Sequence, residues 1–210
     1  MLVQDYYALD PTGARALIAA HGRATIVTAD ADGPRATYGF FLLEPADPPA
    51  PLTVVGHIAK ADPQAAALLA GQPTLLAFDG PHGYISASWY RPTVRTIPST
   101  WNYSAVHLLG TPEVLTGEAA FDVLRRTLAH HEAVLGEQAW RLEGDAMDLA
   151  RRIAPGTLAF RLAATRVEAK AKLSQDKPAE VVASVIDQLE GDGPYAHPAL
   201  AADMRAIRGA

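Results

Sequence analysis

The stretch RATIVTADADGPRATYGFFLLE, residues 23–44, decides the fold class. Two runs rich in β-branched and aromatic residues flank Asp32-Gly33, a dipeptide that supplies the positive φ angles of tight turns. The stretch therefore predicts a β-hairpin. We expect the other strands of the first half to continue it as an antiparallel meander.

Further strand-like and helix-like runs extend outward from this hairpin. Strands are predicted over 53–59, 74–80, 83–90 and 100–115, and a long strand over 157–175. Helices are predicted over 10–22, 62–71, 117–136, 144–156 and 177–191, where Asp-Pro starts and glycine ends mark several boundaries. This pattern predicts a mainly β fold with α (α+β), a split β-barrel with peripheral helices. Residues 1–191 are expected to form one domain, and 192–210 a loosely attached C-terminal tail helix.

Composition limits the function classes. The chain has 210 residues, 49% of them hydrophobic and 20% charged, so it can bury one substantial core. The absence of cysteine excludes thiolate catalysis and cysteine-ligated metal sites. A net charge of −5 disfavours binding of duplex DNA through phosphate neutralisation. The start MLVQDYYALD lacks the features of a signal peptide, so we expect a cytoplasmic protein.

Side chains alternate along two of the predicted strands, so each strand presents two different faces. In GYISASWY (83–90) one face carries Tyr84, Ser86, Ser88 and Tyr90. In TWNYSAVHLLG (100–110) Trp101, Tyr103, Ala105 and His107 share one face, and Asn102, Ser104 and Val106 share the other. We favour an interpretation in which the aromatic side chains form barrel core and the serines face solvent. A ligand site lined by hydroxyl groups is the alternative.

Four ordered motifs carry a resemblance to a known family. They are GHIAKADP (56–63), GPHGYISASWY (80–90), STWNYSAVHLLG (99–110) and KLSQDKP (172–178). Together they resemble the PaiB-like family, the FMN-binding negative transcriptional regulators. The resemblance implies a split β-barrel that forms a homodimer, with cofactor sites at the subunit interface. The family includes haem-dependent piperazate synthases, which close an N–N bond in an N-hydroxylated amino acid.

The resemblance implies that His57, in the Gly-His motif, ligates the iron of haem b. Small residues beside it, Gly56 and Ala59, would let a flat macrocycle approach, and Lys60 with Arg91 or Arg95 would pair with the propionates. FMN is the alternative cofactor. In that case Lys60, Ser86, Ser88 and the arginines would hold the phosphate, and His57 would have a hydrogen-bonding or packing role.

Other residues are weaker candidates. Tyr84, Tyr90, Lys172 and Ser174 are candidate proton-relay or substrate-binding groups, and Trp101, Asn102 and His107 are further candidates for the cofactor site. The chain departs from the family pattern at Tyr38-Gly39-Phe40, where the family has His-Leu-Pro or His-Val-Pro, and at Ser99, where it has proline. The resemblance thus favours a haem-dependent enzyme whose small-molecule substrate is an N-hydroxylated amine. A flavin-binding, PaiB-like regulator is the alternative.

Overall fold

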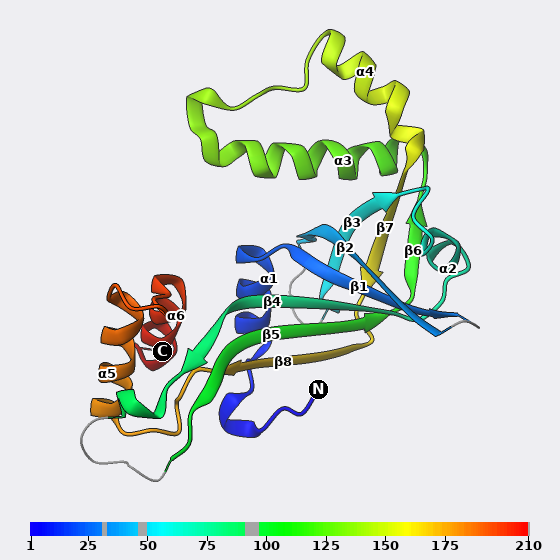
Figure 1. Ribbon diagram of the computed structural model, residues 1–210. Coiled ribbons are helices and arrows are strands. Elements are labelled where there is room, and N and C mark those ends of the chain that lie inside the picture. Colours follow the sequence, from blue (N-terminus) through cyan, green and yellow to red (C-terminus); the bar gives the residue numbers. More distant parts are fainter. Residues whose placement is uncertain (31–32, 46–49, 91–96, 210) are drawn as a thin grey trace. The chain divides into compact units, whose positions relative to one another are not determined.

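The computed structural model describes residues 1–30, 33–45, 50–90 and 97–209. Eight strands form one sheet in the order β6-β7-β3-β2-β1-β4-β5-β8 (Figure 1). The strands are β1 Arg23–Asp30, β2 Gly33–Leu43, β3 Thr53–Ala59, β4 Thr74–Ile85, β5 Thr100–Gly110, β6 Pro112–Leu115, β7 Thr157–Ala163 and β8 Arg166–Lys172. The α-helices are α1 Pro11–Ala20, α2 Ala65–Leu69, α3 Gly117–Glu132, α4 Asp145–Ile153, α5 Ala179–Glu190 and α6 Pro198–Gly209.

The chain folds into two compact units, and each unit takes segments from both halves of the sequence. The hairpin unit comprises Ile18–Phe78 and His107–Val167. The terminal unit comprises Met1–Leu17, Asp79–Val106 and Glu168–Ala210. The assignment of residues 1–191 to a single domain stays a prediction.

The hairpin predicted over residues 23–44 is confirmed. β1 and β2 pair antiparallel from Arg23 opposite Phe40 to Asp30 opposite Gly33. Gly33 has φ 116°, a backbone conformation that a residue with a side chain rarely adopts. The alternating pattern of both strands therefore fits the observed register, and the predicted turn at Asp32 lies outside the described residues.

The centre of the hairpin unit depends on Gly56 of β3. Gly56 pairs with Phe41 of β2 on one side and with Phe160 of β7 on the other. A Cβ at Gly56 would lie 2.5 Å from the carbonyl oxygen of Phe40 and 2.5 Å from Cδ1 of Phe41. The ring of Phe41 thus occupies the space of the missing side chain, and it meets Phe78 and Phe160 edge-on at centroid distances of 5.9 and 5.5 Å.

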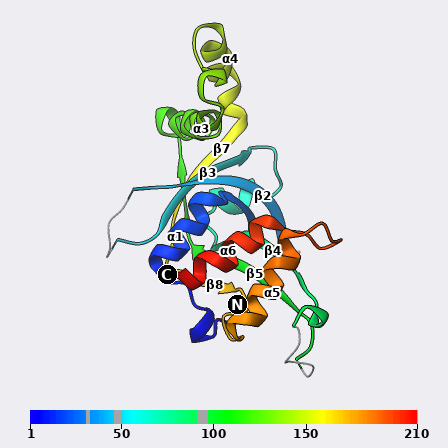
Figure 2. The same ribbon diagram turned by 90° about the vertical axis from the view of Figure 1, so that its left-hand side faces the viewer.

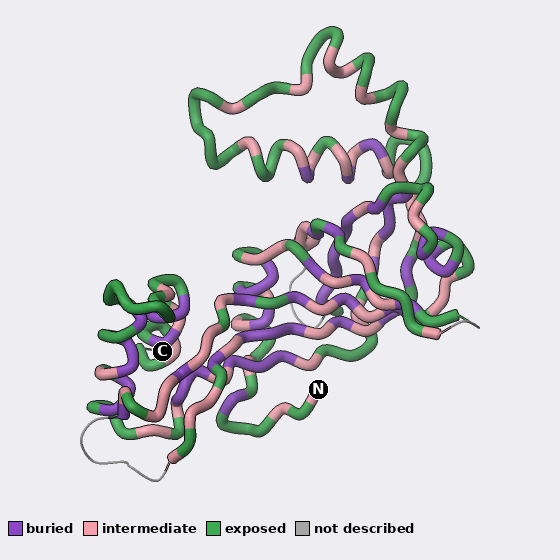
Figure 3. The backbone as a smooth tube through the Cα atoms, viewed as in Figure 1, coloured by how far each residue is buried: buried purple, intermediate pink, exposed green. Residues whose placement is uncertain are grey.

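The opposite face of the same strands is covered by α3. Val55, two residues before His57, packs with Ala159 of β7 and Val123 of α3. Helix α3 contacts β2, β3 and β7 (Figure 1). Residues 128–156, from the end of α3 through α4, contain no buried residue (Figure 3). Only the N-terminal part of this helical segment is therefore fixed by burial.

The terminal unit has its own core, in which α5 and α6 lie side by side (Figure 1 and Figure 2). Val185 and Leu189 of α5 and Leu200 and Met204 of α6 are 0% exposed. The expectation of a loosely attached tail helix is wrong, because α6 is packed into this core.

Four predicted strands differ from the structure. The strand predicted over 74–80 continues to Ile85 as β4 and so joins the start of the strand predicted over 83–90. The strand over 83–90 ends at Ile85, because the chain turns into a 3₁₀-helix, Ala87–Trp89, that Ser86 caps by accepting from the backbone N–H of Ser88 at 3.2 Å. The run 157–175 forms two strands, β7 and β8, instead of one. Between them the backbone N–H of Thr165 donates to the carbonyl of Leu109 at 2.8 Å. The run 100–115 forms β5 and β6.

The favoured interpretation of the faces of β5 is also wrong. Asn102 and Ser104 are 0% and 4% exposed, whereas Trp101 is 48% exposed. The amide of Asn102 can be buried because its hydrogen bonds with Ser174 replace those it would make with water. Among the described residues, no helix is long and apolar enough to cross a membrane.

We predict that Gly56→Ala lowers the free energy of unfolding by about 2–3 kcal/mol, because the added methyl group overlaps a backbone oxygen and an aromatic ring that cannot both move away. Urea denaturation followed by circular dichroism measures this loss. Gly156→Ala is the matched control in the same unit, since a Cβ there has nothing within 4 Å. Equal unfolding midpoints for the two variants would contradict the close packing at Gly56.

Candidate functional site

His57 lies on the face of β3 that is turned away from the Phe41 core. It pairs with Phe40 of β2 and with Ala159 of β7. Directly paired residues in antiparallel strands lie on the same face of a sheet. The imidazole therefore projects toward the side that α3 covers, between an aromatic neighbour and a small one.

A cavity of about 420 Å³ opens beside His57 in the hairpin unit. Three strand residues, Tyr38, Gly39 and Phe40, form one wall, and Thr127 and His131 of α3 form another. The complete lining is Tyr38, Gly39, Phe40, His57, Ile58, Ala59, Thr127 and His131. Three of the residues at which the chain departs from the family pattern, Tyr38, Gly39 and Phe40, thus lie in the His57 cavity, whereas Ser99 lines the pocket of the terminal unit.

The imidazole of His57 is half-buried, and one of its two nitrogens makes no hydrogen bond among the described residues. Its Nδ1 is buried and has no hydrogen-bond partner among the described residues. Burial lowers the pKa of His57 below its usual value of 6.5, so the ring is neutral at pH 7. A buried polar atom without a partner costs about 1–3 kcal/mol, and a group from outside the chain can remove that cost. A neutral imidazole is also the form that binds a metal.

The cavity is aromatic and carries little charge. The ring of His131 meets Phe40 edge-on at a centroid distance of 5.2 Å. The guanidinium of Arg23 stacks over the outer residue Tyr38, 4.0 Å from the ring centroid, but Arg23 itself is not part of the lining. The described lining residues therefore include no lysine or arginine that would bind a phosphate. Across the described residues, no group of three or more histidines or carboxylates could hold a metal ion.

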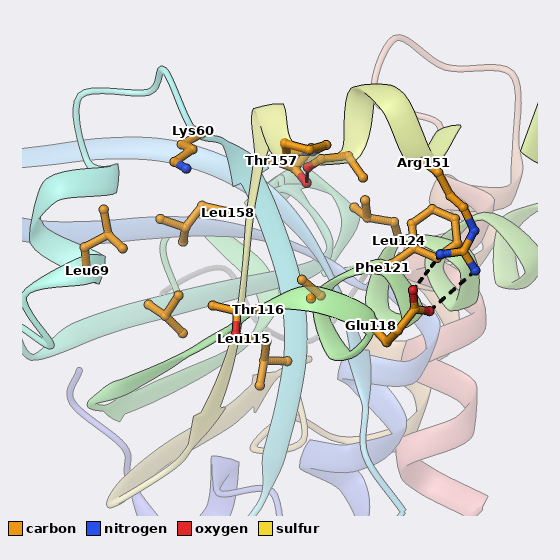
Figure 4. Close-up of a pocket in the computed structure, with 15 residues that line it drawn as sticks. Lys60, Leu69, Leu115, Thr116, Glu118, Phe121, Leu124, Arg151, Thr157 and Leu158 are labelled. Carbon is orange, nitrogen blue, oxygen red and sulfur yellow. Dashed lines mark hydrogen bonds and ion pairs between the residues drawn. The ribbon is translucent and has the colours of Figure 1, made fainter. Parts of the chain in front are cut away.

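Lys60 lines a second cavity of the hairpin unit, of about 410 Å³, and not the His57 cavity. Figure 4 shows Lys60 on one side of this space and Arg151, Glu118 and Phe121 on the other. Arg151 binds Glu118 at 2.6 Å and lies 4.5 Å from the centroid of the Phe121 ring. Gly56 does not open the His57 cavity either, because the ring of Phe41 fills its place on the opposite face. The room expected beside His57 comes from Ala59 and from the backbone of Gly39.

Several predicted site residues gather in an aromatic cluster of the terminal unit. Trp101 stacks on His82 at a centroid distance of 5.9 Å, and Tyr84 lies 6.5 Å from Trp101 and 5.2 Å from Tyr195. Ser86 and Ser88 hydrogen-bond to each other at 2.8 Å. Their hydroxyl groups therefore already stabilise the turn after β4.

Tyr90 is not on the face that was predicted for it. It is 3% exposed and packs in the core with Ile85 and α5. Its hydroxyl has no hydrogen-bond partner among the described residues, and burial raises its pKa. His107 is half-buried on β5 of the hairpin unit and does not line the His57 cavity. Arg91 and Arg95 lie outside the described residues.

Lys172, Ser174 and Asn102 come together in the terminal unit. They line a pocket of about 160 Å³ with seven other residues, namely Tyr7, Ile97, Pro98, Ser99, Thr100, Asp176 and Lys177. The hydroxyl of Ser174 donates to Asn102 Oδ1 at 3.2 Å and accepts from Asn102 Nδ2 at 3.0 Å. Ser174 therefore positions Asn102 and is not available as a free nucleophile.

Sequence reasoning missed the residues that complete the His57 cavity. Tyr38, Phe40, Thr127 and His131 were not assigned to the His57 cavity, although strand pairing places Phe40 directly opposite His57. A hairpin alignment from Asp30-Gly33 upward would have placed Tyr38 and Phe40 on one face. The contribution of α3 had no signal in the sequence, because it depends on how the helix packs across the sheet.

The comparisons with known proteins identify the family. The model of the family described as "Putative FMN-binding domain" matches residues 1–166. The chain belongs to this family. It is also 30% identical over 141 residues to the Protease synthase and sporulation protein PAI 2 of Bacillus subtilis, over 66% of this chain and 65% of that protein. The chain thus spans slightly less than two thirds of this relative's length. The resemblance to the PaiB-like family is confirmed.

Solved structures confirm the split β-barrel fold. The FAD and Heme binding protein from Mycobacterium smegmatis superposes with a TM-score of 0.55 at 19% identity, over 86% of this chain and 80% of that chain. The flavocytochrome Anf3 from Azotobacter vinelandii superposes with a TM-score of 0.58 at 21% identity, over 80% of this chain and 72% of that chain. At these identities the likeness establishes the fold and leaves the cofactor open.

The lowered pKa of His57 predicts how stability depends on pH. Below about pH 6.5 the imidazole is protonated in the unfolded chain before it is protonated in the folded one, so the free energy of unfolding falls as the pH falls through this range. His57→Gln should remove the contribution of His57 to this fall in the free energy of unfolding. Urea midpoints at pH 7.5, 6 and 5 measure it. His130→Gln, an exposed residue of α3, is the control, and an unchanged pH slope for His57→Gln would contradict the burial argument.

Proposed function

We propose that the protein is a haem-dependent enzyme of the PaiB-like family in which His57 is the axial ligand of the iron. The observation that carries this proposal is the half-buried imidazole of His57, which lines an aromatic cavity and whose buried Nδ1 has no partner among the described residues. A neutral imidazole among aromatic and apolar lining residues suits haem, because the iron binds a ring nitrogen and the macrocycle binds apolar side chains.

The residues of the cavity fit this group. His57 would hold the iron, the rings of Tyr38 and Phe40 would contact the macrocycle, and Ala59 and the backbone of Gly39 leave room for it. When bound, haem supplies a ferric Lewis acid that polarises an N–O group of the substrate. Arg23, which stacks on Tyr38, is the nearby cation that can pair with a propionate.

The reaction we propose is closure of an N–N bond in an N-hydroxylated amino acid that also carries an amine, as the family resemblance implies. The amine nitrogen forms the new bond with its lone pair while the N–O bond breaks. The leaving oxygen takes the proton of the amine and departs as water, so no external oxidant or reductant is needed.

His131 is the residue to which we assign this proton transfer. Its imidazole lines the cavity and can both accept and donate a proton. The hydroxyl of Thr127 already donates to the carbonyl of Val123 at 2.8 Å, so it can only accept. The earlier candidates Tyr84, Tyr90, Lys172 and Ser174 belong to the terminal unit, and their catalytic roles stay predictions.

FMN binding is the second candidate function, and the family description supports it. The solved neighbours include proteins whose names state FAD, haem or flavocytochrome character. Against FMN in the His57 cavity, a phosphate needs several donors and positive charges, and the described lining residues include neither lysine nor arginine. In this alternative the protein would be a flavin-binding, PaiB-like regulator.

The absorption spectrum of the purified protein, expressed with a supply of haem precursor, distinguishes the two. We predict a Soret band near about 400 nm, which His57→Ala abolishes while the far-UV circular dichroism stays unchanged. His130→Ala, on an exposed face of α3, should keep the band. His131→Ala should also keep it and lose turnover of an N-hydroxylated diamino acid.

Two results would overturn the haem proposal. A normal Soret band in His57→Ala would remove His57 as ligand. Paired bands near about 370 and 450 nm that survive this substitution would establish a flavin held by other residues.

A homodimer, cytoplasmic and without a nucleic-acid partner, remains part of the proposal. Its support is exposed apolar surface in the hairpin unit: Tyr38 is 62% exposed, Val134 84% and Ile153 64%. We predict a mass of about twice 22.3 kDa by light scattering at micromolar concentration, and a lower mass for Ile153→Asp. A monomeric mass for the unchanged protein would contradict the dimer.

A further inference from the structure

The pocket of the terminal unit contains a positive charge that the described chain does not neutralise. Nζ of Lys172 donates to the hydroxyl of Thr100 and to the carbonyl of Trp101, the latter at 3.1 Å. Both acceptors are uncharged, and no carboxylate among the described residues forms an ion pair with Lys172. Burial lowers the pKa of Lys172, as expected for an ammonium group that is withdrawn from water without a counter-ion.

The carboxylate in the same pocket, Asp176, already has hydrogen-bond partners. Asp176 accepts from the hydroxyl of Tyr7 at 3.0 Å and from Nζ of Lys177 at 3.1 Å. Burial alone would raise the pKa of Asp176, but the hydrogen bonds from Lys177 and Tyr7 outweigh it and leave that pKa below its usual value. The charges of Asp176 and Lys177 therefore neutralise each other, and the net charge of the described pocket residues is the single positive charge of Lys172.

Two hydroxyl groups beside Lys172 have hydrogens to donate. Oγ of Ser99 accepts from the backbone N–H of Ala87 at 2.9 Å, and Oγ1 of Thr100 accepts from Lys172. Neither hydroxyl donates to an acceptor within the described part of the chain. Lys172, Ser99 and Thr100 thus present three donors to one small space.

The turn that follows Lys172 contains a residue in an unusual backbone conformation. Ser174 has φ 65°, a conformation that a residue with a side chain rarely adopts. The paired hydrogen bonds with the fully buried Asn102 hold Ser174 there. Gln175 adds two more, because its side chain accepts from the N–H of Leu173 at 2.7 Å and donates to the carbonyl of Ala171 at 2.6 Å. This turn fixes the base of Lys172 before any ligand arrives.

We propose that this pocket binds the carboxylate of a small organic acid, with Lys172 as its counter-ion and the hydroxyls of Ser99 and Thr100 as further donors. The pocket measures about 160 Å³, which suits a carboxylate and a few attached atoms. One uncompensated positive charge matches a monoanion. Asp176 in the same wall repels the second charge of a phosphate dianion. The site belongs wholly to the terminal unit and does not depend on the cofactor proposed for His57.

Titration of the ¹⁵N-labelled protein with sodium acetate at constant ionic strength tests the proposal, with amide shifts as the readout. Acetate should give saturable shifts at the amides of Lys172 and Ser174, and acetamide, its neutral isostere, should give none. Lys172→Met, which keeps the length of the side chain and removes the charge, should weaken acetate binding at least tenfold. Lys172→Arg should restore most of it. Lys60→Met, a lysine of the hairpin unit, should leave it unchanged.

A second variant keeps the test open if Lys172→Met does not fold. Thr100→Val removes one donor, retains the charge and should weaken acetate binding several-fold. The proposal is overturned if acetate gives no saturable shift, if acetamide binds as well as acetate, or if both substitutions leave the acetate affinity unchanged. Stronger binding of inorganic phosphate than of acetate would overturn the carboxylate assignment in favour of a phosphate site.

Discussion

The missing side chain at Gly56 is the constraint on which the hairpin unit depends. The ring of Phe41 lies where a Cβ would stand and from there contacts Phe78 and Phe160. This packing sets the face that β2, β3 and β7 turn to the core. Since side chains alternate along a strand, the next residue, His57, must lie on the opposite face. Gly56 is thus required for packing, because a side chain there would clash with Phe41, and His57 supplies the imidazole of the cavity on the opposite face.

The two units present different chemistry. In the hairpin unit a neutral imidazole faces aromatic rings, and no lysine or arginine belongs to the described lining of its cavity. That environment suits a planar, weakly charged group bound through one ring nitrogen. In the terminal unit a half-buried ammonium stands among hydroxyl groups, and a paired acid and base are its charged neighbours. That environment suits a compact anion. Each site is incomplete in the described chain for a different physical reason: the first lacks a hydrogen-bond or metal partner, and the second lacks a counter-ion.

Much of the fold followed from local patterns. The hairpin over 23–44 and helices α1, α3, α4 and α5 were predictable because turn dipeptides, caps and periodic apolar residues act over a few positions. Errors occurred where longer-range contacts decide. Serine capping after Ile85 ended a predicted strand, and hydrogen bonds between Asn102 and Ser174, 72 residues apart, buried a polar face of β5 that the pattern assigned to solvent. The tail helix looked independent, yet Leu200 and Met204 are fully buried against α5.

By itself the sequence determined the β1–β2 hairpin, helices α1, α3, α4 and α5, the family through four ordered motifs, and the candidate residues His57 and Lys172. It did so because these signals are carried by residue type and short spacing. Only the tertiary structure decided which residues share a site. It placed Lys60 in another cavity than His57, brought Tyr38 and Phe40 beside the imidazole, and joined Lys172 to Ser99 and Thr100. Such groupings depend on strand register and on how helices pack across the sheet. Both are set by the combined burial of distant residues, which no single stretch of sequence contains.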